Sequence, residues 1–146
     1  MADITSDGPF SSFLGIERWF AVVTGAGVVL RLHGVEWPIH QGDAPLRFDG
    51  AAAPDCRLVD GPTRDLNLMT RGGRSEMQLV GERAWRDDTH LRALFTATPG
   101  RWTDGTHSRY LQAHTLLWDD AQAGEAWEYA PAHRSAIAGW WLSHSP

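Results

Sequence analysis

The sequence predicts an all-β protein built as a sandwich or barrel of short strands, and three observations support this fold class. Gly and Pro are frequent, with 15 and 8 residues among 146, so turns divide the chain into short pieces. Between the turns, apolar and polar residues alternate with the period of two that a half-buried strand requires. The turns recur at near-regular spacing, which is typical of sandwiches and barrels.

The first half of the chain contains six strand candidates. Arg18–Thr24 and Val28–Gly34 flank a Gly-Ala-Gly turn, which predicts a hairpin between them. A Trp-Pro pair between His33 and His40 predicts a loop. Further short strands are expected at Pro45–Asp49, Asp55–Val59, Leu66–Thr70 and Ser75–Val80.

The second half repeats this style. Residues 82–95 have some helical spacing, but the Asp-Asp-Thr-His run within them favours a turn, so any helix is one short piece. A weak internal echo links RWFAVVTGAG, which begins at Arg18, with RALFTATPGRW, which begins at Arg92, and suggests two similar β units. Strands are expected at Leu91–Ala97, Ser108–Gln112, His114–Trp118, Ala126–Tyr129 and Ser135–Leu142.

Composition limits the possible functions. The net charge is −5 and the 13 basic residues are scattered arginines, so no basic stripe supports nucleic-acid binding. No apolar stretch is long enough for a membrane helix, and no signal peptide is recognisable. The single cysteine, Cys56, fits a reducing cytoplasm and is expected to be an inert core thiol. The eight tryptophans predict a core built on aromatic volume, an aromatic-lined pocket, or both.

Two segments carry a resemblance to a known family. DGPFSSFLGIERWFAVVTGAGVVLRL (Asp7–Leu32) and LVDGPTRDLNLMTRGG (Leu58–Gly73) resemble the two motifs of the HutD/Ves family, and HTLLWDD and the final WWL resemble its second half. The chain departs from the family pattern at Leu14, which replaces a proline, at Leu66, which replaces a phenylalanine, and at Gly72, which replaces a second arginine.

The resemblance implies a cupin-like double-stranded β-barrel or sandwich in a bicupin arrangement, and a link to histidine utilisation without an established catalytic activity. We expect a first unit over residues 1–80 and a second over residues 81–146, joined in one compact body. The family also has an N-terminal stretch that this sequence lacks before Ala2. We therefore expect the first unit to miss N-terminal strands and to have an open edge that favours association.

No metal or other cofactor is expected. In the cupin pattern, Arg18 stands where a metal-binding Glu would be, and Ser11–Leu14 stand where a His-x-His pair would be. A cation in place of an anion repels a divalent metal. The histidines of this sequence show no short spacing, such as His-x-His, that is typical of metal ligands.

Arg18 suits a carboxylate instead, because guanidinium presents a planar fork of donors. Asp65 and Asn67 are two residues apart and therefore share one face of the predicted strand. On that face Asp65 could hold Arg18, and Asn67 could offer a donor and an acceptor. We expect these three residues, with Ser12 and Met69, to form a ligand site. The alternative is a structural Arg–Asp pair that ties two strands together, with Asn67 closing a turn.

The sequence thus favours a cytoplasmic, non-catalytic protein that binds a small carboxylate metabolite and moderates histidine utilisation. Its expected partners include neither nucleic acid nor membrane, and a homo-oligomer is possible. One alternative is a small-molecule isomerase or hydrolase with Asp65 as base, although a tight Arg18 would lower the pKa of Asp65 and weaken it. Another alternative is an interaction module without a ligand.

Overall fold

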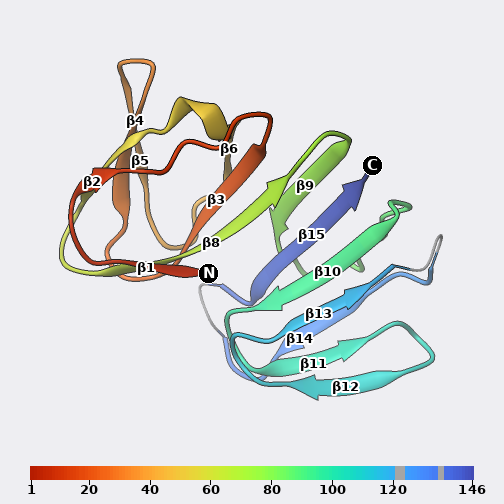
Figure 1. Ribbon diagram of the computed structural model, residues 1–146. Coiled ribbons are helices and arrows are strands. Elements are labelled where there is room, and N and C mark those ends of the chain that lie inside the picture. Colours follow the sequence, from red (N-terminus) through yellow and green to blue (C-terminus); the bar gives the residue numbers. More distant parts are fainter. Residues whose placement is uncertain (121–123, 135–136) are drawn as a thin grey trace. The chain divides into compact units, whose positions relative to one another are not determined.

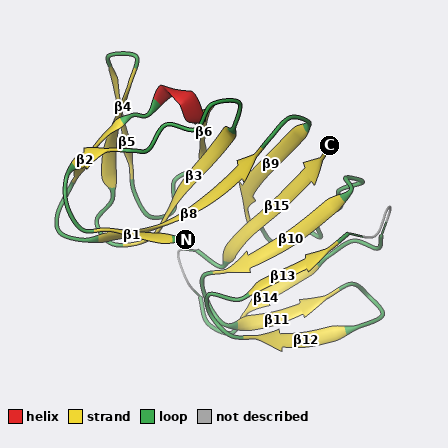
Figure 2. Ribbon diagram, viewed as in Figure 1, coloured by secondary structure: helices red, strands yellow, loops and turns green. Residues whose placement is uncertain are grey.

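A computed structural model describes residues 1–120, 124–134 and 137–146, and nearly all of its regular elements are β-strands (Figure 1). The strands form four antiparallel sheets, so the predicted all-β fold is confirmed. Within the described residues the only helical element is a short 3-10 turn at Gly50–Ala52 (Figure 2). No described helix is long and apolar enough to cross a membrane.

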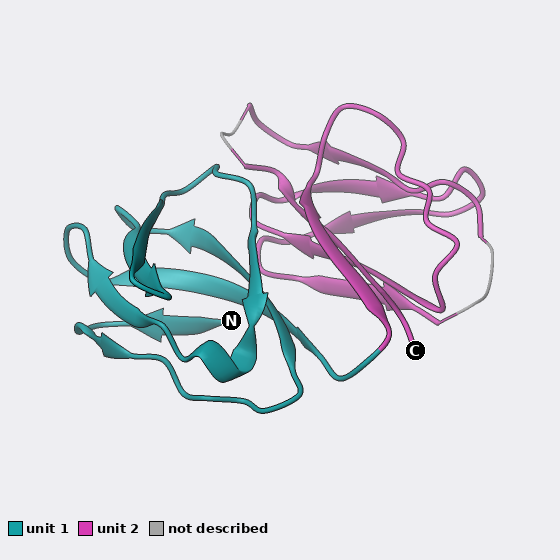
Figure 3. Ribbon diagram, turned by 90° about the horizontal axis from the view of Figure 1, so that it is seen from above, with its two compact units in different colours: residues 1–72 teal, residues 73–146 magenta. Residues whose placement is uncertain are grey.

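The chain divides into two compact units, which we call unit 1 (Met1–Gly72) and unit 2 (Gly73–Pro146) (Figure 3). The boundary was expected at residue 80. It lies earlier because Arg74–Leu79, the last strand assigned to the first unit, pairs along its length with Gly139–Ser145 near the end of the chain. Strand pairing therefore places Arg74–Leu79 in unit 2.

Unit 1 is a jelly roll. Its two sheets have the orders β1-β8-β3-β6 and β2-β7-β4-β5. The first strand thus pairs with the eighth, the second with the seventh, the third with the sixth and the fourth with the fifth. Two such sheets with eight strands are the arrangement of jelly rolls, which include the cupins. The strands are β1 (Ala2–Ile4), β2 (Gly8–Pro9), β3 (Glu17–Thr24), β4 (Val28–Leu32), β5 (Val35–Ile39), β6 (Leu46–Asp49), β7 (Asp55–Leu58) and β8 (Thr63–Thr70).

Unit 2 repeats this topology with one strand reduced to a single bridge. Its sheets have the orders β13-β10-β15-β9 and β12-β11-β14, and an isolated bridge joins Trp85 to Trp127. When Trp85 is counted as the second strand, the pairing order matches that of unit 1. The strands are β9 (Arg74–Leu79), β10 (Leu91–Thr96), β11 (Gly100–Thr103), β12 (Ser108–Leu111), β13 (Leu116–Asp119), β14 (Glu128–Pro131) and β15 (Gly139–Ser145).

The internal echo in the sequence has a structural basis. Its two segments form β3 and β10, which are the third strands of their units. Each lies in its sheet between the strands in sixth and eighth position, β6 and β8 in unit 1 and β13 and β15 in unit 2. The echo therefore marks equivalent strands.

The predicted hairpin between β3 and β4 is wrong, because the two strands belong to different sheets. The turn between them contains Gly25 and Gly27, both with positive φ. A Cβ on Gly27 would collide with the carbonyl oxygen of Ile39. These glycines let the chain leave one sheet and enter the other at close range.

β4 instead forms its hairpin with β5, a segment that had been expected to be a loop. Pro38 lies within β5, which is the edge strand of its sheet, a position where the missing N–H of proline is tolerated. Strands β2 and β11 were not predicted either. The last strand was predicted at Ser135–Leu142. Residues 135 and 136 of this range lie outside the described residues, and β15 begins at Gly139.

Each unit has its own apolar core. The core of unit 1 is mostly aliphatic and includes Cys56, whose pKa burial raises to about 11, as suits an unreactive thiol. Unit 2 instead uses tryptophan. Its cluster contains Trp85, Trp102, Trp127 and Trp141, and the rings of Trp85 and Trp141 stack at 5.0 Å. The prediction of an aromatic core is confirmed for unit 2.

Candidate functional site

Arg18 lies near the start of β3, on the face that forms the core of unit 1. Phe20, two residues further on, is a member of the core, and alternate residues of a strand share one face. Across to β8, Arg18 is opposite Met69 and Phe20 is opposite Asn67. Asp65 is opposite Val22, so these β8 side chains lie on the same face as Arg18.

A chain of hydrogen bonds joins Arg18, Asn67 and Asp65. Arg18 Nε donates to Asn67 Oδ1 at 2.6 Å, and Asn67 Nδ2 donates to Asp65 Oδ2 at 2.8 Å. The backbone N–H of Ala2 in β1 donates to Asp65 Oδ1 at 3.0 Å. We had expected Asp65 to hold Arg18 directly. The structure shows instead that Asn67 connects the two charged groups, because its amide offers an acceptor and a donor.

Both charged groups are buried, with Arg18 8% exposed and Asp65 2% exposed. Burial raises the pKa of Asp65, against the opposing effects of Asn67, the Ala2 amide and the Arg18 charge. Burial also lowers the pKa of Arg18, against the Coulombic effect of Asp65. Arginine remains charged in proteins, so unit 1 contains a buried cation whose nearest carboxyl group is easier to protonate than usual.

Aromatic rings support the guanidinium of Arg18. Its Cζ atom lies 4.4 Å from the ring centroid of Phe10 and 5.5 Å from that of Phe48. Cation–π attraction of this kind strengthens when the cation is withdrawn from water. Phe10 follows directly after β2 and Phe48 lies in β6, so neighbouring strands of both sheets fix the side chain.

Two of the three guanidinium nitrogens of Arg18 remain available. Nε is bonded to Asn67, whereas neither Nη atom has a hydrogen-bond partner among the described residues. Two adjacent N–H donors with fixed geometry match the two oxygens of a carboxylate. The arrangement is therefore suited to hold a carboxylate end-on.

A cavity of about 750 Å³ surrounds this end of Arg18. Its size falls in the range of small-molecule sites, and its mix of apolar walls with few polar groups is typical of them. The lining residues are all in unit 1: Met1, Ala2, Ile4, Pro9, Phe10, Ser11, Phe13, Arg18, Asp65, Asn67, Leu68 and Met69.

Four of the five predicted ligand residues, Arg18, Asp65, Asn67 and Met69, line this cavity. Ser12 does not. Its hydroxyl donates to the carbonyl oxygen of Ala51 at 3.3 Å, and its neighbour Ser11 lines the cavity instead. Residues 10–13 belong to no strand, so the sequence pattern does not show which of the two serines faces the cavity.

Phe10 was missed as a site residue. It belongs to the quoted Gly-Pro-Phe-Ser motif, but nothing in its local pattern indicates that its ring lies against an arginine eight residues later. For metals, the described residues contain no group of three or more His, Cys, Asp or Glu side chains that could hold an ion.

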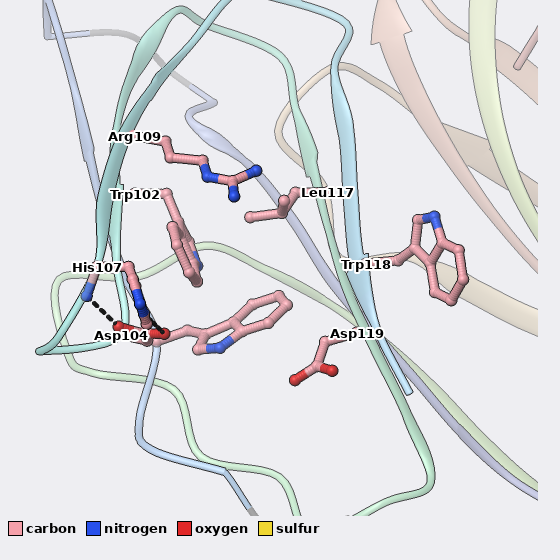
Figure 4. Close-up of a pocket in the computed structure, with 8 residues that line it drawn as sticks. Trp102, Asp104, His107, Arg109, Leu117, Trp118 and Asp119 are labelled. Atoms are coloured by element: carbon pink, nitrogen blue, oxygen red, sulfur yellow. Dashed lines mark hydrogen bonds and ion pairs between the residues drawn. The ribbon is translucent and has the colours of Figure 1, made fainter. Parts of the chain in front are cut away.

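Unit 2 contains a separate pocket of about 280 Å³ (Figure 4). It is bounded by β11, β12 and β13 and by Trp127. Figure 4 shows the side chains of Trp102, Arg109 and Leu117 extending toward one region, with Trp118 on the other side of its strand. The full set of lining residues is Trp102, Asp104, His107, Arg109, Leu117, Trp118, Asp119 and Trp127.

Comparison with known proteins finds relatives in Pseudomonas. A curated protein of Pseudomonas putida, described as an uncharacterized 21.2 kDa protein in the hutC 3′ region, is 30% identical over 118 residues. That match covers 80% of this chain, which spans only half the length of the relative.

Two solved structures share the fold. A conserved protein of unknown function from Pseudomonas aeruginosa PAO1 matches with a TM-score of 0.84 and 26% identity, over 99% of this chain and 77% of that one. HutD from Pseudomonas fluorescens SBW25, solved in a formate condition, matches with a TM-score of 0.82 and 25% identity, over 98% of this chain and 75% of that one.

The family model for HutD matches residues 1–136, which is most of the chain and includes the Arg18 cavity. The chain therefore belongs to the HutD family.

Proposed function

We propose that the protein binds a small carboxylate metabolite in the cavity of unit 1 and through this binding moderates histidine utilisation. The observation that supports the proposal most directly is the state of Arg18. As a whole residue Arg18 is 8% exposed, and among the described residues its two Nη atoms lack hydrogen-bond partners. Arg18 lines the cavity, so a ligand carboxylate that enters it can pair with these two donors.

In this proposal each group has a distinct role. The two Nη donors of Arg18 hold the carboxylate, and Asn67 fixes the guanidinium by accepting from its Nε. Asp65 fixes Asn67 in turn and balances part of the charge. Phe10 and Met69 supply apolar walls for the rest of the ligand. Preorganisation of this kind favours binding because little side-chain freedom remains to be lost.

The genomic setting of a relative supports a role in histidine utilisation. The Pseudomonas putida relative is described by its position beside hutC, and the chain belongs to the HutD family. We propose a carboxylate intermediate of histidine breakdown as the ligand class. We also propose a cytoplasmic location, which a single buried cysteine fits because thiols stay reduced there.

An enzyme with Asp65 as general base is the second candidate. Burial raises the pKa of Asp65, as a base acting near neutral pH requires. However, both carboxylate oxygens already accept hydrogen bonds, from the Ala2 amide and from Asn67. This occupancy disfavours proton abstraction from a substrate and makes the binding role the better supported one.

A thermal-shift screen tests the proposal. Formate, acetate and the carboxylate intermediates of histidine breakdown are added singly, and a ligand that binds the folded state raises the melting temperature by mass action. The neutral amide of each compound is the control, because it keeps the shape but loses the charge. If no carboxylate stabilises the protein more than its amide, the binding proposal fails and the ligand-free interaction module is favoured.

A further inference from the structure

We propose that the pocket of unit 2 is a second ligand site, which binds a small zwitterion of the α-amino acid type. This inference does not depend on the Arg18 cavity. The pocket of unit 2 is lined from the fourth to the seventh strand positions of its jelly roll, whereas the cavity of unit 1 is lined from the first, second, third and eighth. It is therefore not a copy of the first site.

Buried aromatic side chains form part of the pocket wall. Trp102 and Trp127 are 6% and 3% exposed, and their rings meet edge to face at 5.2 Å. Leu117 packs against the same cluster. A volume of about 280 Å³ lies just below the usual range for ligand pockets. The site thus fits a molecule with the size of an amino acid better than a nucleotide.

Arg109 supplies an unpaired cation to this pocket. It lies in β12 and is exposed, and it has no hydrogen-bond or ion-pair partner among the described residues. Its guanidinium extends from β12 toward the same region as Leu117 (Figure 4). A free planar fork at the edge of a pocket is suited to a carboxylate.

Two carboxylates in the same lining are held in place by the protein. Asp119 Oδ2 accepts from the buried Arg92 at 3.0 Å, while a third of the Asp119 side chain stays exposed. Asp104 accepts from the backbone N–H groups of Thr106 and His107 at 2.9 and 2.6 Å. These bonds fix both carboxylates in the lining. An ionised carboxylate has about four acceptor sites, so Asp119 can accept from an ammonium group in addition to Arg92.

The balance of charges selects the ligand class. Among the lining side chains, Arg109 offsets one of the two carboxylates, Asp104 and Asp119. The other is offset by Arg92, which lies outside the lining and pairs with Asp119, so these four side chains sum to zero. A ligand with net charge gains little from such a site, whereas a zwitterion can place its carboxylate on Arg109 and its ammonium on Asp119. The ring of Trp127, over which the Arg92 guanidinium already lies at 4.8 Å, adds an aromatic surface.

Nuclear magnetic resonance on the full chain tests this inference. The indole N–H of Trp102 is buried and has no hydrogen-bond partner among the described residues, so its signal reports on the pocket wall. We expect glycine, L-alanine, L-serine or L-histidine, at concentrations up to about 20 mM, to shift this signal saturably. That range would nearly saturate a site with a dissociation constant of about 1 mM. The Trp102→Phe variant assigns the signal.

Charge-deleted probes and variants decide the outcome. The amide and the N-acetyl form of the best amino acid each lack one charge and should bind about tenfold more weakly, as should the parent amino acid to Arg109→Gln. Arg83→Gln, which changes another exposed arginine of unit 2, should bind normally, and so should Arg18→Met, which removes only the first site. If no amino acid shifts the Trp102 signal, or if the charge-deleted forms bind equally well, the inference is overturned.

Discussion

Arg18 and Arg92 are equivalent residues of the two units, and they have different partners. Each is the second residue of the third strand of its jelly roll, and each is buried. Each guanidinium lies over an aromatic ring, at 4.4 Å from Phe10 for Arg18 and at 4.8 Å from Trp127 for Arg92. The difference is in the Nη atoms.

Both Nη atoms of Arg92 are occupied by the protein. Nη1 donates to the carbonyl oxygen of Glu125 at 2.9 Å, and Nη2 donates to Asp119 at 3.0 Å. Within the part of the chain that the structure describes, Arg18 donates only through Nε, to Asn67. Repetition of one fold has thus produced one arginine whose two Nη atoms pair within the protein and one whose Nη donors are available for a ligand. The Nε of Arg92 is buried without a partner among the described residues. The two residues should therefore respond differently to mutation.

The first prediction concerns ligand binding by Arg18. Arg18→Lys should weaken binding of a carboxylate found in the thermal-shift screen by about tenfold or more, because lysine keeps the charge but loses the planar pair of donors. Isothermal titration calorimetry measures the dissociation constant. Arg57→Lys, at an exposed position of unit 1 outside the cavity lining, is the matched control. Equal affinity in Arg18→Lys and wild type would leave Arg18 with a structural role only.

The second prediction concerns stability and Arg92. Arg92→Met should lower the free energy of unfolding by about 3 kcal/mol, since it leaves Asp119 and the Glu125 carbonyl without their buried partner. Arg83→Met, at an exposed position, should change it by less than about 0.5 kcal/mol. Urea denaturation gives both values. Carboxylate binding at Arg18 should be the same in Arg92→Met as in wild type, and a loss of that binding would show that the two arginines do not act separately.

Local patterns were sufficient to predict much of the site. Alternation over Arg18–Thr24 predicted β3, and the spacing of Asp65 and Asn67 placed both on one face. These inferences depend on the period of two within single strands, which the chain itself specifies. The buried position of Cys56 followed from its apolar neighbours in the same way.

Strand partners could not be predicted from local patterns. The hairpin expected between β3 and β4 failed because a jelly roll pairs β3 with β6 and β8, which lie far along the chain. The position of Phe10 against Arg18 and the central role of Asn67 depend on the same long-range pairing. Ser11 and Ser12 lie in an irregular segment without strand alternation, so the sequence could not show that Ser11 rather than Ser12 lines the cavity.

The third prediction concerns the glycines of the turn between β3 and β4, where a hairpin had been predicted. Gly27 and Gly34 both have positive φ, at 107° and 82°. A Cβ on Gly27 would collide with the Ile39 backbone, whereas a Cβ on Gly34 would meet nothing within 4 Å. Gly34→Ala should therefore cost only the backbone strain, about 1 to 3 kcal/mol, and Gly27→Ala should cost clearly more. Urea denaturation of the pair separates the two effects, and equal losses would contradict the collision.

The last prediction concerns pH and Asp65. Burial raises the pKa of its carboxyl group above the ordinary value of 3.8, which the unfolded chain retains. The folded state therefore binds this proton more tightly than the unfolded state does. The stabilisation that results is fully present below pH 3.8 and is lost as the pH rises through the raised, folded pKa.

Asp65→Asn removes this titration. Wild type should therefore lose stability relative to Asp65→Asn as the pH is raised from about 3.8 toward neutrality, whatever constant offset the lost hydrogen bond from Ala2 or Asn67 adds. Urea denaturation across this range measures the difference. Asp60→Asn, which changes an exposed carboxylate of unit 1, should not reproduce the trend. A stability difference between wild type and Asp65→Asn that stays constant, or that moves in favour of wild type with rising pH, would show that burial does not control the titration of Asp65.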